Sequence, residues 1–215
     1  MTELIIFDLD GTLLDTIYDL ATSVNHALRK NGYPEHELAE YPFFVGNGIY
    51  KLIERAMPES ERTDENVLRL RQDFVAYYTQ HNTDLTAPYP GIGELVAELS
   101  RRGIGMAVAS NKYQEATLKL VTHYFGTGTF RVVLGQREGI APKPDPAIVS
   151  DILAATGIAR EATLYVGDSG VDMRTAANAG LRSVGVTWGF RPRKELEDNG
   201  AVHLIDSPGE LLGLL

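Results

Sequence analysis

The sequence predicts an α/β protein, a doubly wound Rossmann-like parallel sheet with a small helical domain inserted near its start. Two observations carry this prediction. From about residue 90 onward, apolar segments of strand length alternate with segments of helical length, which is typical of a parallel sheet covered by helices on both faces. Between residues 18 and 80, by contrast, apolar residues recur only at helical spacing, and no strand is predicted there.

The first element is the apolar run 4–7, which ends at Asp8 and has the character of a buried parallel strand. The insertion that follows contains three apolar stripes. The first stops at Asn31-Gly32 and the second at Pro58, because these residues end helices. The stripes are Leu20, Val24, Ala27 and Leu28; Ile49, Leu52, Ile53 and Ala56; and Val67, Leu70, Phe74, Tyr77 and Tyr78.

The remaining elements alternate in order along the chain. Helices are predicted at 92–101, 114–124, 146–156 and 171–179, with a short one from Arg193. Strands are predicted at 105–109, near 131–134, and at 163–166, 182–186 and 203–205. We therefore expect residues 1–15 and 83–215 to form the α/β core and residues 16–82 to form the helical insertion.

Composition narrows the function classes. The 215 residues are 44% hydrophobic and 23% charged, which suits a globular protein with a sizeable core. The absence of cysteine excludes disulfides, thiolate metal sites and cysteine nucleophiles. A net charge of −9 disfavours binding to nucleic acid or anionic membranes. With neither a signal peptide nor a membrane-spanning run expected, a cytoplasmic location is predicted.

Polar side chains follow the apolar strands, at the end of the sheet where ligands bind in such folds. Packed carboxylates repel one another unless a cation lies between them. Oxygen donors alone suit Mg²⁺, and the lack of cysteine or a histidine pair disfavours zinc. The residues are Asp8, Asp10, Gly11 and Thr12 after the first strand; Ser110, Asn111 and Lys112 after the second; Asp168, Ser169 and Asp172 after the fourth; and Lys143 before a helix.

Four segments in this order resemble the motifs of the haloacid dehalogenase superfamily. They are Asp8-Leu9-Asp10-Gly11-Thr12, Ser110, Lys143, and Gly167-Asp168-Ser169-Gly170-Val171-Asp172. A single aspartate after a strand is more often a helix cap or turn residue, and a single lysine is usually solvated. Four motifs together favour the resemblance, which covers essentially the whole chain and implies a magnesium-dependent hydrolase.

Asp8 can attack phosphorus as a covalent nucleophile. The resemblance implies that Asp10 is the general acid and base and that its backbone carbonyl ligates the metal. Thr12 is expected to hold Asp10 in place. The metal set is predicted to be Asp8, Asp10 and Asp168, with Asp172 and Ser169 in support. The phosphoryl group is expected to bind Ser110, Asn111, Lys143 and Thr12.

The helical insertion occupies the position of the superfamily's cap, which closes over the site and excludes water. Segments 45–49, 52–56 and 187–190 are similar to those of phosphoglycolate phosphatases. The cap implies a small phosphorylated metabolite as substrate, and this likeness makes 2-phosphoglycolate the first candidate. Alternatives are a pyrophosphatase, a nucleotide or sugar phosphatase, a β-phosphoglucomutase, and a non-catalytic binding module. A monomer or homodimer is expected.

Several polar and aromatic residues receive no chemical role. Asp15 is interpreted as the start of the linker to the insertion, and Asp19 as a solvated helix residue. Trp188 and Phe190 are interpreted as packing residues at the edge of the site. The five histidines have no ligand spacing.

Overall fold

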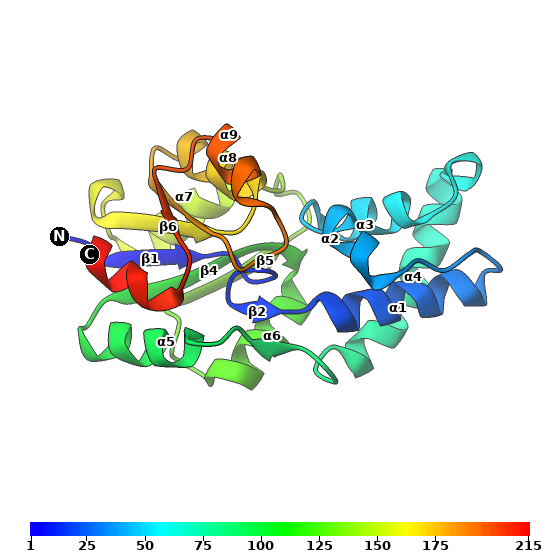
Figure 1. The fold of residues 1–215 in the computed structure, drawn as a ribbon, viewed down its shortest axis with the longest axis horizontal. Helices are drawn as coiled ribbons and strands as arrows, with labels where there is room; N and C mark the ends of the chain where they lie inside the picture. Colours follow the sequence, from blue (N-terminus) through cyan, green and yellow to red (C-terminus); the bar gives the residue numbers. More distant parts are fainter.

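The computed structural model describes residues 1–215 and contains a six-stranded parallel sheet in the order β5-β4-β1-β6-β7-β8. Helices cover both faces of the sheet (Figure 1), so the predicted fold class is confirmed. The strands are β1 (Leu4–Phe7), β4 (Gly105–Tyr113), β5 (Val132–Gln136), β6 (Thr163–Gly167), β7 (Arg182–Val186) and β8 (His203–Ile205). The helices that accompany them are α5 (Ile92–Arg101), α6 (Gln114–Phe125), α7 (Ala147–Thr156), α8 (Gly170–Asn178) and α9 (Arg193–Asp198).

Strand β1 lies at the centre of the sheet, paired with β4 on one side and β6 on the other. Its side chains alternate between the two faces, as a strand requires. Ile5 and Phe7 pack with α5 and α6, and Leu4 and Ile6 pack with α7 and α8. Burial on both faces explains why the sequence of β1 is a continuous apolar run. It also fixes Asp8 at the carboxyl end of the central strand.

Residues 17–81 are helical and lie beyond the carboxyl ends of the strands, opposite the two chain termini (Figure 1). Their helices enclose an apolar cluster of their own, to which α6 adds Ala116. The longer elements are α1 (Ile17–Lys30), α2 (Tyr41–Phe44), α3 (Gly48–Ala56) and α4 (Asp64–His81), with short 3₁₀ turns at Leu38–Glu40 and Glu59–Glu61. No helix is both long and apolar enough to cross a membrane.

A two-stranded antiparallel pair joins the helices to the sheet. It consists of β2 (Leu14–Asp15) and β3 (Ala87–Pro88), so the outgoing and returning segments run side by side. Strands of two residues are too short to leave a periodic signal, and the sequence did not predict them.

The interpretation of Asp19 as a solvated residue is wrong. Its side chain is buried at the base of α1, and its carboxylate accepts hydrogen bonds from the backbone N–H groups of Leu85 and Thr86 at 2.9–3.1 Å. Helical periodicity alone placed Asp19 on the polar side of α1, whereas the returning chain covers that side. Asp19 therefore ties the first helix to the segment that leads back to the sheet.

We expect Asp19→Ala to lower the free energy of unfolding by about 1–3 kcal/mol, because the substitution leaves backbone N–H groups without an acceptor in a buried position. Urea unfolding followed by circular dichroism measures the change. Asp19→Asn is the matched control, because it keeps one acceptor oxygen and should lose less. Equal stability of Asp19→Ala and the wild type would show that water replaces the carboxylate at no cost.

Candidate active site

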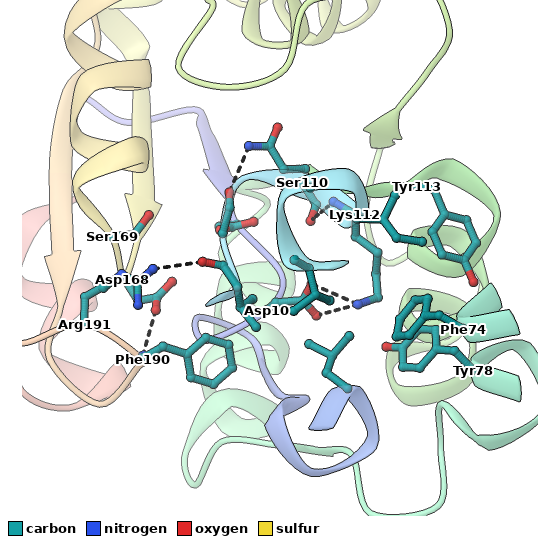
Figure 2. A pocket seen from close by; sticks show the side chains of 18 residues that line it. Asp10, Phe74, Tyr78, Ser110, Lys112, Tyr113, Asp168, Ser169, Phe190 and Arg191 are labelled. Carbon is teal, nitrogen blue, oxygen red and sulfur yellow. Dashed lines mark hydrogen bonds and ion pairs between the residues drawn. The ribbon is translucent and has the colours of Figure 1, made fainter. Parts of the chain in front are cut away.

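The carboxyl ends of β1, β4 and β6 meet beneath an open cavity (Figure 2). The sheet side of this cavity is polar and carries Asp8, Asp10, Ser110, Lys112 and Asp168. The side formed by the helices is apolar. It includes Leu20, Val45, Ile49, Leu52 and Phe74. A small charged group can thus bind at the sheet with apolar side chains of the helices facing it.

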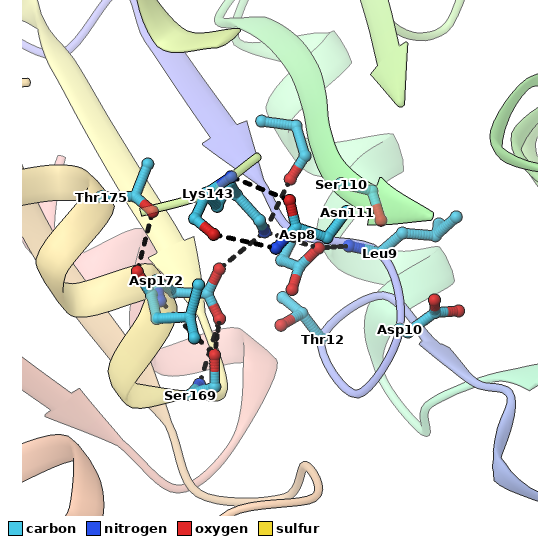
Figure 3. A network of polar contacts seen from close by, with 12 residues as sticks. Asp8, Leu9, Asp10, Thr12, Ser110, Asn111, Lys143, Ser169, Asp172 and Thr175 are labelled. Atoms are coloured by element: carbon cyan, nitrogen blue, oxygen red, sulfur yellow. Dashed lines mark hydrogen bonds and ion pairs between the residues drawn. The ribbon is translucent and has the colours of Figure 1, made fainter. Parts of the chain in front are cut away.

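Three charged side chains form the floor of the site (Figure 3). The ammonium group of Lys143 lies 2.9 Å from Asp8 Oδ1 and 2.8 Å from Asp172 Oδ1. It also donates to the backbone carbonyl of Ala109 at 2.9 Å. The Lys143 side chain is 1% exposed, so its charge is held by these oxygens and not by solvent. The backbone N–H of Leu9 donates to Asp8 Oδ1 at 2.7 Å and helps to fix the rotamer of that carboxylate.

Burial shapes the electrostatics of these groups. Desolvation raises the pKa of Asp8 well above its usual range; repulsion from Asp172 and Asp168 adds to the rise, and Lys143 opposes it. Burial alone would lower the pKa of Lys143, but attraction to Asp172 and Asp8 outweighs it and raises that pKa. Lys143 therefore stays charged, and the floor holds more negative than positive charge when its carboxyls are ionised.

Asp168 occupies a tight position between two glycines. A Cβ atom on Gly11, which has φ +85°, would overlap the Asp168 carboxylate, and one on Gly189 would overlap its Cβ. The backbone N–H of Phe190 donates to Asp168 Oδ2 at 2.8 Å. Desolvation, with repulsion from Asp172, raises the pKa of Asp168 to about 7. Sequence reasoning listed Gly11 after the first strand but missed Gly189, because the need for a glycine at position 189 arises only from the close approach of two distant segments.

Ser169 and Asp172 cap the start of α8 together. The Ser169 hydroxyl donates to Asp172 Oδ2 at 2.5 Å, and the Ser169 backbone N–H donates to the same oxygen at 3.1 Å. This reciprocal capping box leaves Asp172 Oδ1 for Lys143. The pair thus orients the lysine that faces Asp8.

Asp8, Asp168 and Asp172 each present a carboxylate oxygen, and these atoms lie within 4.8 Å of one another. An all-oxygen donor set at this spacing fits a hard divalent cation such as Mg²⁺. The raised pKa values of Asp8 and Asp168 point the same way, because a bound cation would offset both the desolvation and the repulsion that raise them. The predicted set differs in one member, since it contained Asp10 in place of Asp172.

The Asp10 carboxylate points away from this cluster. It accepts hydrogen bonds from Lys112 Nζ at 3.0 and 2.9 Å and from the Thr16 hydroxyl at 2.8 Å. The prediction that Thr12 holds Asp10 is wrong, because the Thr12 hydroxyl instead donates to Asp168 Oδ1 at 3.3 Å. If Asp10 contacts a metal, it therefore does so through its backbone carbonyl, as the sequence resemblance implied.

Thr16 is a site residue that sequence reasoning missed, and Lys112 is one that it placed at the end of a strand but gave no role. The available signal for Lys112 was its position two residues after Ser110 in the same strand, β4, which places both on one side. Ser110 and Lys112 both line the cavity. Thr16 lies in the turn before α1 and gives no periodic signal.

Ser110 and Asn111 are both buried at the end of β4. The side-chain amide of Asn111 accepts from the backbone N–H of Lys143 at 2.9 Å and donates to the backbone carbonyl of Gly46 at 3.0 Å. Asn111 thereby connects the Lys143 segment to the loop before α3. The Ser110 hydroxyl accepts from the Lys112 backbone N–H at 3.2 Å and faces the cavity.

The loop after β7 also belongs to the site. The indole N–H of Trp188 donates to the backbone carbonyl of Thr12 at 3.0 Å, and Phe190 lines the cavity. Arg191 donates to the backbone carbonyls of Pro42 and Val45. These contacts fasten the loop before α3 to the sheet side of the cavity.

Comparison with known proteins agrees with this arrangement. Residues 5–186 match the family model described as haloacid dehalogenase-like hydrolase. A phosphoglycolate phosphatase of Mesorhizobium japonicum is 34% identical, over 95% of this chain and 92% of its own length. One from Vibrio cholerae is 33% identical, over 98% and 95%.

Two solved structures are similar over nearly the whole chain. A predicted phosphoglycolate phosphatase of Haemophilus somnus superposes with a TM-score of 0.90 at 27% identity and covers 99% of this chain and 97% of its own. A variant of CbbY from Rhodobacter sphaeroides, in complex with xylulose-1,5-bisphosphate, superposes with a TM-score of 0.82 at 26% identity and covers 98% and 96%. The chain belongs to the haloacid dehalogenase-like hydrolases.

Proposed function

We propose that the protein is a magnesium-dependent phosphatase that hydrolyses a small phosphate monoester, with 2-phosphoglycolate as the first candidate substrate. The observation that carries the proposal is the pairing of Asp8 with a fully buried Lys143 beside the Asp168 and Asp172 carboxylates. In this proposal Asp8 serves as the nucleophile, Lys143 as a fixed positive charge, and the carboxylates as cation ligands. Phosphoryl transfer is catalysed mainly by such positioned charge.

In the first step, an Asp8 oxygen forms a bond to phosphorus while the bond from phosphorus to the ester oxygen breaks. Asp10 gives its proton to the departing oxygen. In the second step, water attacks the phosphorus of the aspartyl phosphate, Asp10 takes a proton from that water, and inorganic phosphate leaves with the Asp8 carboxylate restored. Lys112 and Thr16 hold the Asp10 carboxylate in position.

Lys143, the Ser110 hydroxyl and nearby backbone N–H groups bind the phosphoryl oxygens in this proposal, with Asn111 and Thr12 bordering them. Asp8, Asp168 and the backbone carbonyl of Asp10 hold Mg²⁺, and Asp172 and Ser169 support the site. When bound, the metal offsets negative charge that accumulates on the transferring phosphoryl group. Residues 16–82 act as a cap over the core formed by residues 1–15 and 83–215, and restrict substrate size.

The relatives at 33–34% identity support phosphoglycolate as the substrate. The more distant CbbY structure, with its bound sugar bisphosphate, favours a sugar phosphate as the second candidate. The specificity constants kcat/KM for 2-phosphoglycolate, xylulose-1,5-bisphosphate, pyrophosphate, a nucleoside monophosphate and β-glucose-1-phosphate discriminate between them. We expect kcat/KM for 2-phosphoglycolate to exceed that for each of the other substrates by about tenfold or more, which is a difference that one additional contact to the substrate can produce. A higher constant for the sugar bisphosphate would assign the second function.

Metal binding should strengthen with pH. The pKa of Asp168 is about 7 in the folded chain against 3.8 in the unfolded one, so the folded metal-free protein retains a proton that the unfolded chain loses. Between about pH 4 and pH 7, rising pH therefore destabilises the metal-free fold, whereas it frees Asp168 to bind a cation. Isothermal titration with MgCl₂ should show tighter binding at pH 8 than at pH 6. In a separate assay, chelation of the metal by EDTA should lower turnover by at least about tenfold. Binding that is equal at both pH values would contradict the assignment of Asp168 as a ligand.

A further inference from the structure

The helical side of the cavity carries no charged side chain. Every residue from 16–82 that lines it is apolar or glycine, apart from Tyr78. A substrate with a second anionic group must therefore find its cation on the sheet side. Two cations line the cavity there, Lys112 and Arg191.

Arg191 is already occupied. Its guanidinium donates to the backbone carbonyls of Pro42 and Val45, and its Nε lies 3.4 Å from Glu195. These contacts direct its donors toward the loop before α3 and toward α9. Lys112 is the remaining candidate.

Lys112 is nearly buried, with a side chain 4% exposed. Two N–H donors of its ammonium group serve the two Asp10 oxygens, and no acceptor in the structure takes the third. The ammonium also lies 4.9 Å from the centre of the Tyr78 ring. Figure 2 shows Lys112, Tyr78 and Tyr113 on the same side of the cavity.

The Tyr78 side chain provides a second, independent observation. It is completely buried at 0% exposure, it lines the cavity, and its hydroxyl has no hydrogen-bond partner. The hydroxyl of the neighbouring Tyr113 is also without a partner. Buried polar groups are nearly always paired, and an unpaired one carries a desolvation cost. These hydroxyls and the free N–H of Lys112 are donors that lack an acceptor, which an anionic ligand would supply.

Building on the proposed function, we propose that Lys112 and Tyr78 bind a carboxylate of the substrate that is attached one carbon from the ester oxygen. Asp10 is the group that protonates this ester oxygen, and the Lys112 ammonium lies within 3.0 Å of both Asp10 oxygens. A carboxylate on the adjoining carbon therefore comes to lie beside Lys112.

The test compares two phosphate monoesters of matched length: 2-phosphoglycolate, and 2-hydroxyethyl phosphate, which has a neutral hydroxyl group in place of the carboxylate. Wild type, Lys112→Met and Tyr78→Phe are assayed on both with saturating Mg²⁺. The ratio of the two kcat/KM values should fall by about ten- to a hundredfold in Lys112→Met and by roughly three- to tenfold in Tyr78→Phe. In Tyr78→Phe the loss should appear as a higher KM for 2-phosphoglycolate alone. Lys194→Met and Tyr18→Phe, at exposed positions, are the controls for net charge and for hydroxyl removal.

If Lys112 only positions Asp10, Lys112→Met will slow both substrates by the same factor and leave the ratio unchanged, which overturns the proposal. Should Lys112→Met fail to fold, an unchanged ratio in Tyr78→Phe overturns it equally, because that variant removes only an unpaired hydroxyl. A wild type that does not prefer 2-phosphoglycolate to its analogue refutes both the substrate and the carboxylate subsite. A wild type that prefers 2-phosphoglycolate, with variants that keep the preference, refutes the subsite alone.

Discussion

Asp8→Asn should reduce kcat by more than about a thousandfold, because a carboxamide is a poor nucleophile and the substitution also removes an anionic metal ligand. This decrease in kcat is expected to exceed the decrease caused by removing a single hydrogen bond to the transition state, because the covalent route itself is lost. The measurement is the steady-state rate on p-nitrophenyl phosphate at saturating Mg²⁺. A kcat within tenfold of the wild type would show that Asp8 is not the nucleophile.

The same variant should fold. Burial and neighbouring carboxylates raise the pKa of Asp8, so the site favours the neutral form of this side chain in the absence of metal. Asn removes the charge at nearly constant volume. We therefore expect the thermal midpoint of metal-free Asp8→Asn at pH 8 to be no lower than that of the wild type, which separates a chemical loss from unfolding.

Asp10→Asn should lower kcat by about a hundredfold to ten-thousandfold, the usual contribution of general acid–base catalysis. The loss should depend on the leaving group. A good leaving group such as p-nitrophenolate departs without a proton, so the first step is slowed least; an alkyl ester needs the proton and is slowed most. Rates on a series of aryl and alkyl phosphates measure this dependence.

Lys112 and Thr16 should still hold the amide oxygen of Asn at position 10, because both contact the Asp10 carboxylate as donors. The variant then keeps the geometry of the turn but lacks the acidic proton of the carboxyl group. Equal, near-native rates of this variant on good and poor leaving groups would contradict the acid–base role of Asp10.

The sequence predicted the parts of the site that are tied to strand ends. An apolar run buried on both faces marks a central parallel strand, and the residue after it must lie at the carboxyl edge of the sheet. Asp8 and Asp168 could be placed in this way, and they do lie together. Lys143 follows no strand directly. Its place in the site was expected only from the order of the motifs.

What the sequence did not predict depends on contacts between distant segments. The partners of the Asp10 carboxylate come from a turn and from a residue 102 positions away, and neither leaves a periodic signal. Asp19 was misjudged because helical spacing cannot show that the chain returning at Leu85 covers its side of α1. The role of Arg191 in holding the loop before α3 likewise arises only once the helices are packed on the sheet.

The central claim is that Asp8 carries the phosphoryl group, and the phosphoenzyme tests it most directly. Asp10→Asn lacks the base that the second step requires, so a covalent intermediate formed from an activated substrate should accumulate. The variant is mixed with acetyl phosphate and Mg²⁺, quenched rapidly in acid, and examined by intact-mass spectrometry and peptide mapping. We predict a single added phosphoryl group on Asp8, and none in the Asp8→Asn/Asp10→Asn double variant. A phosphoryl group mapped to any other residue, or one that persists in the double variant, would contradict the mechanism.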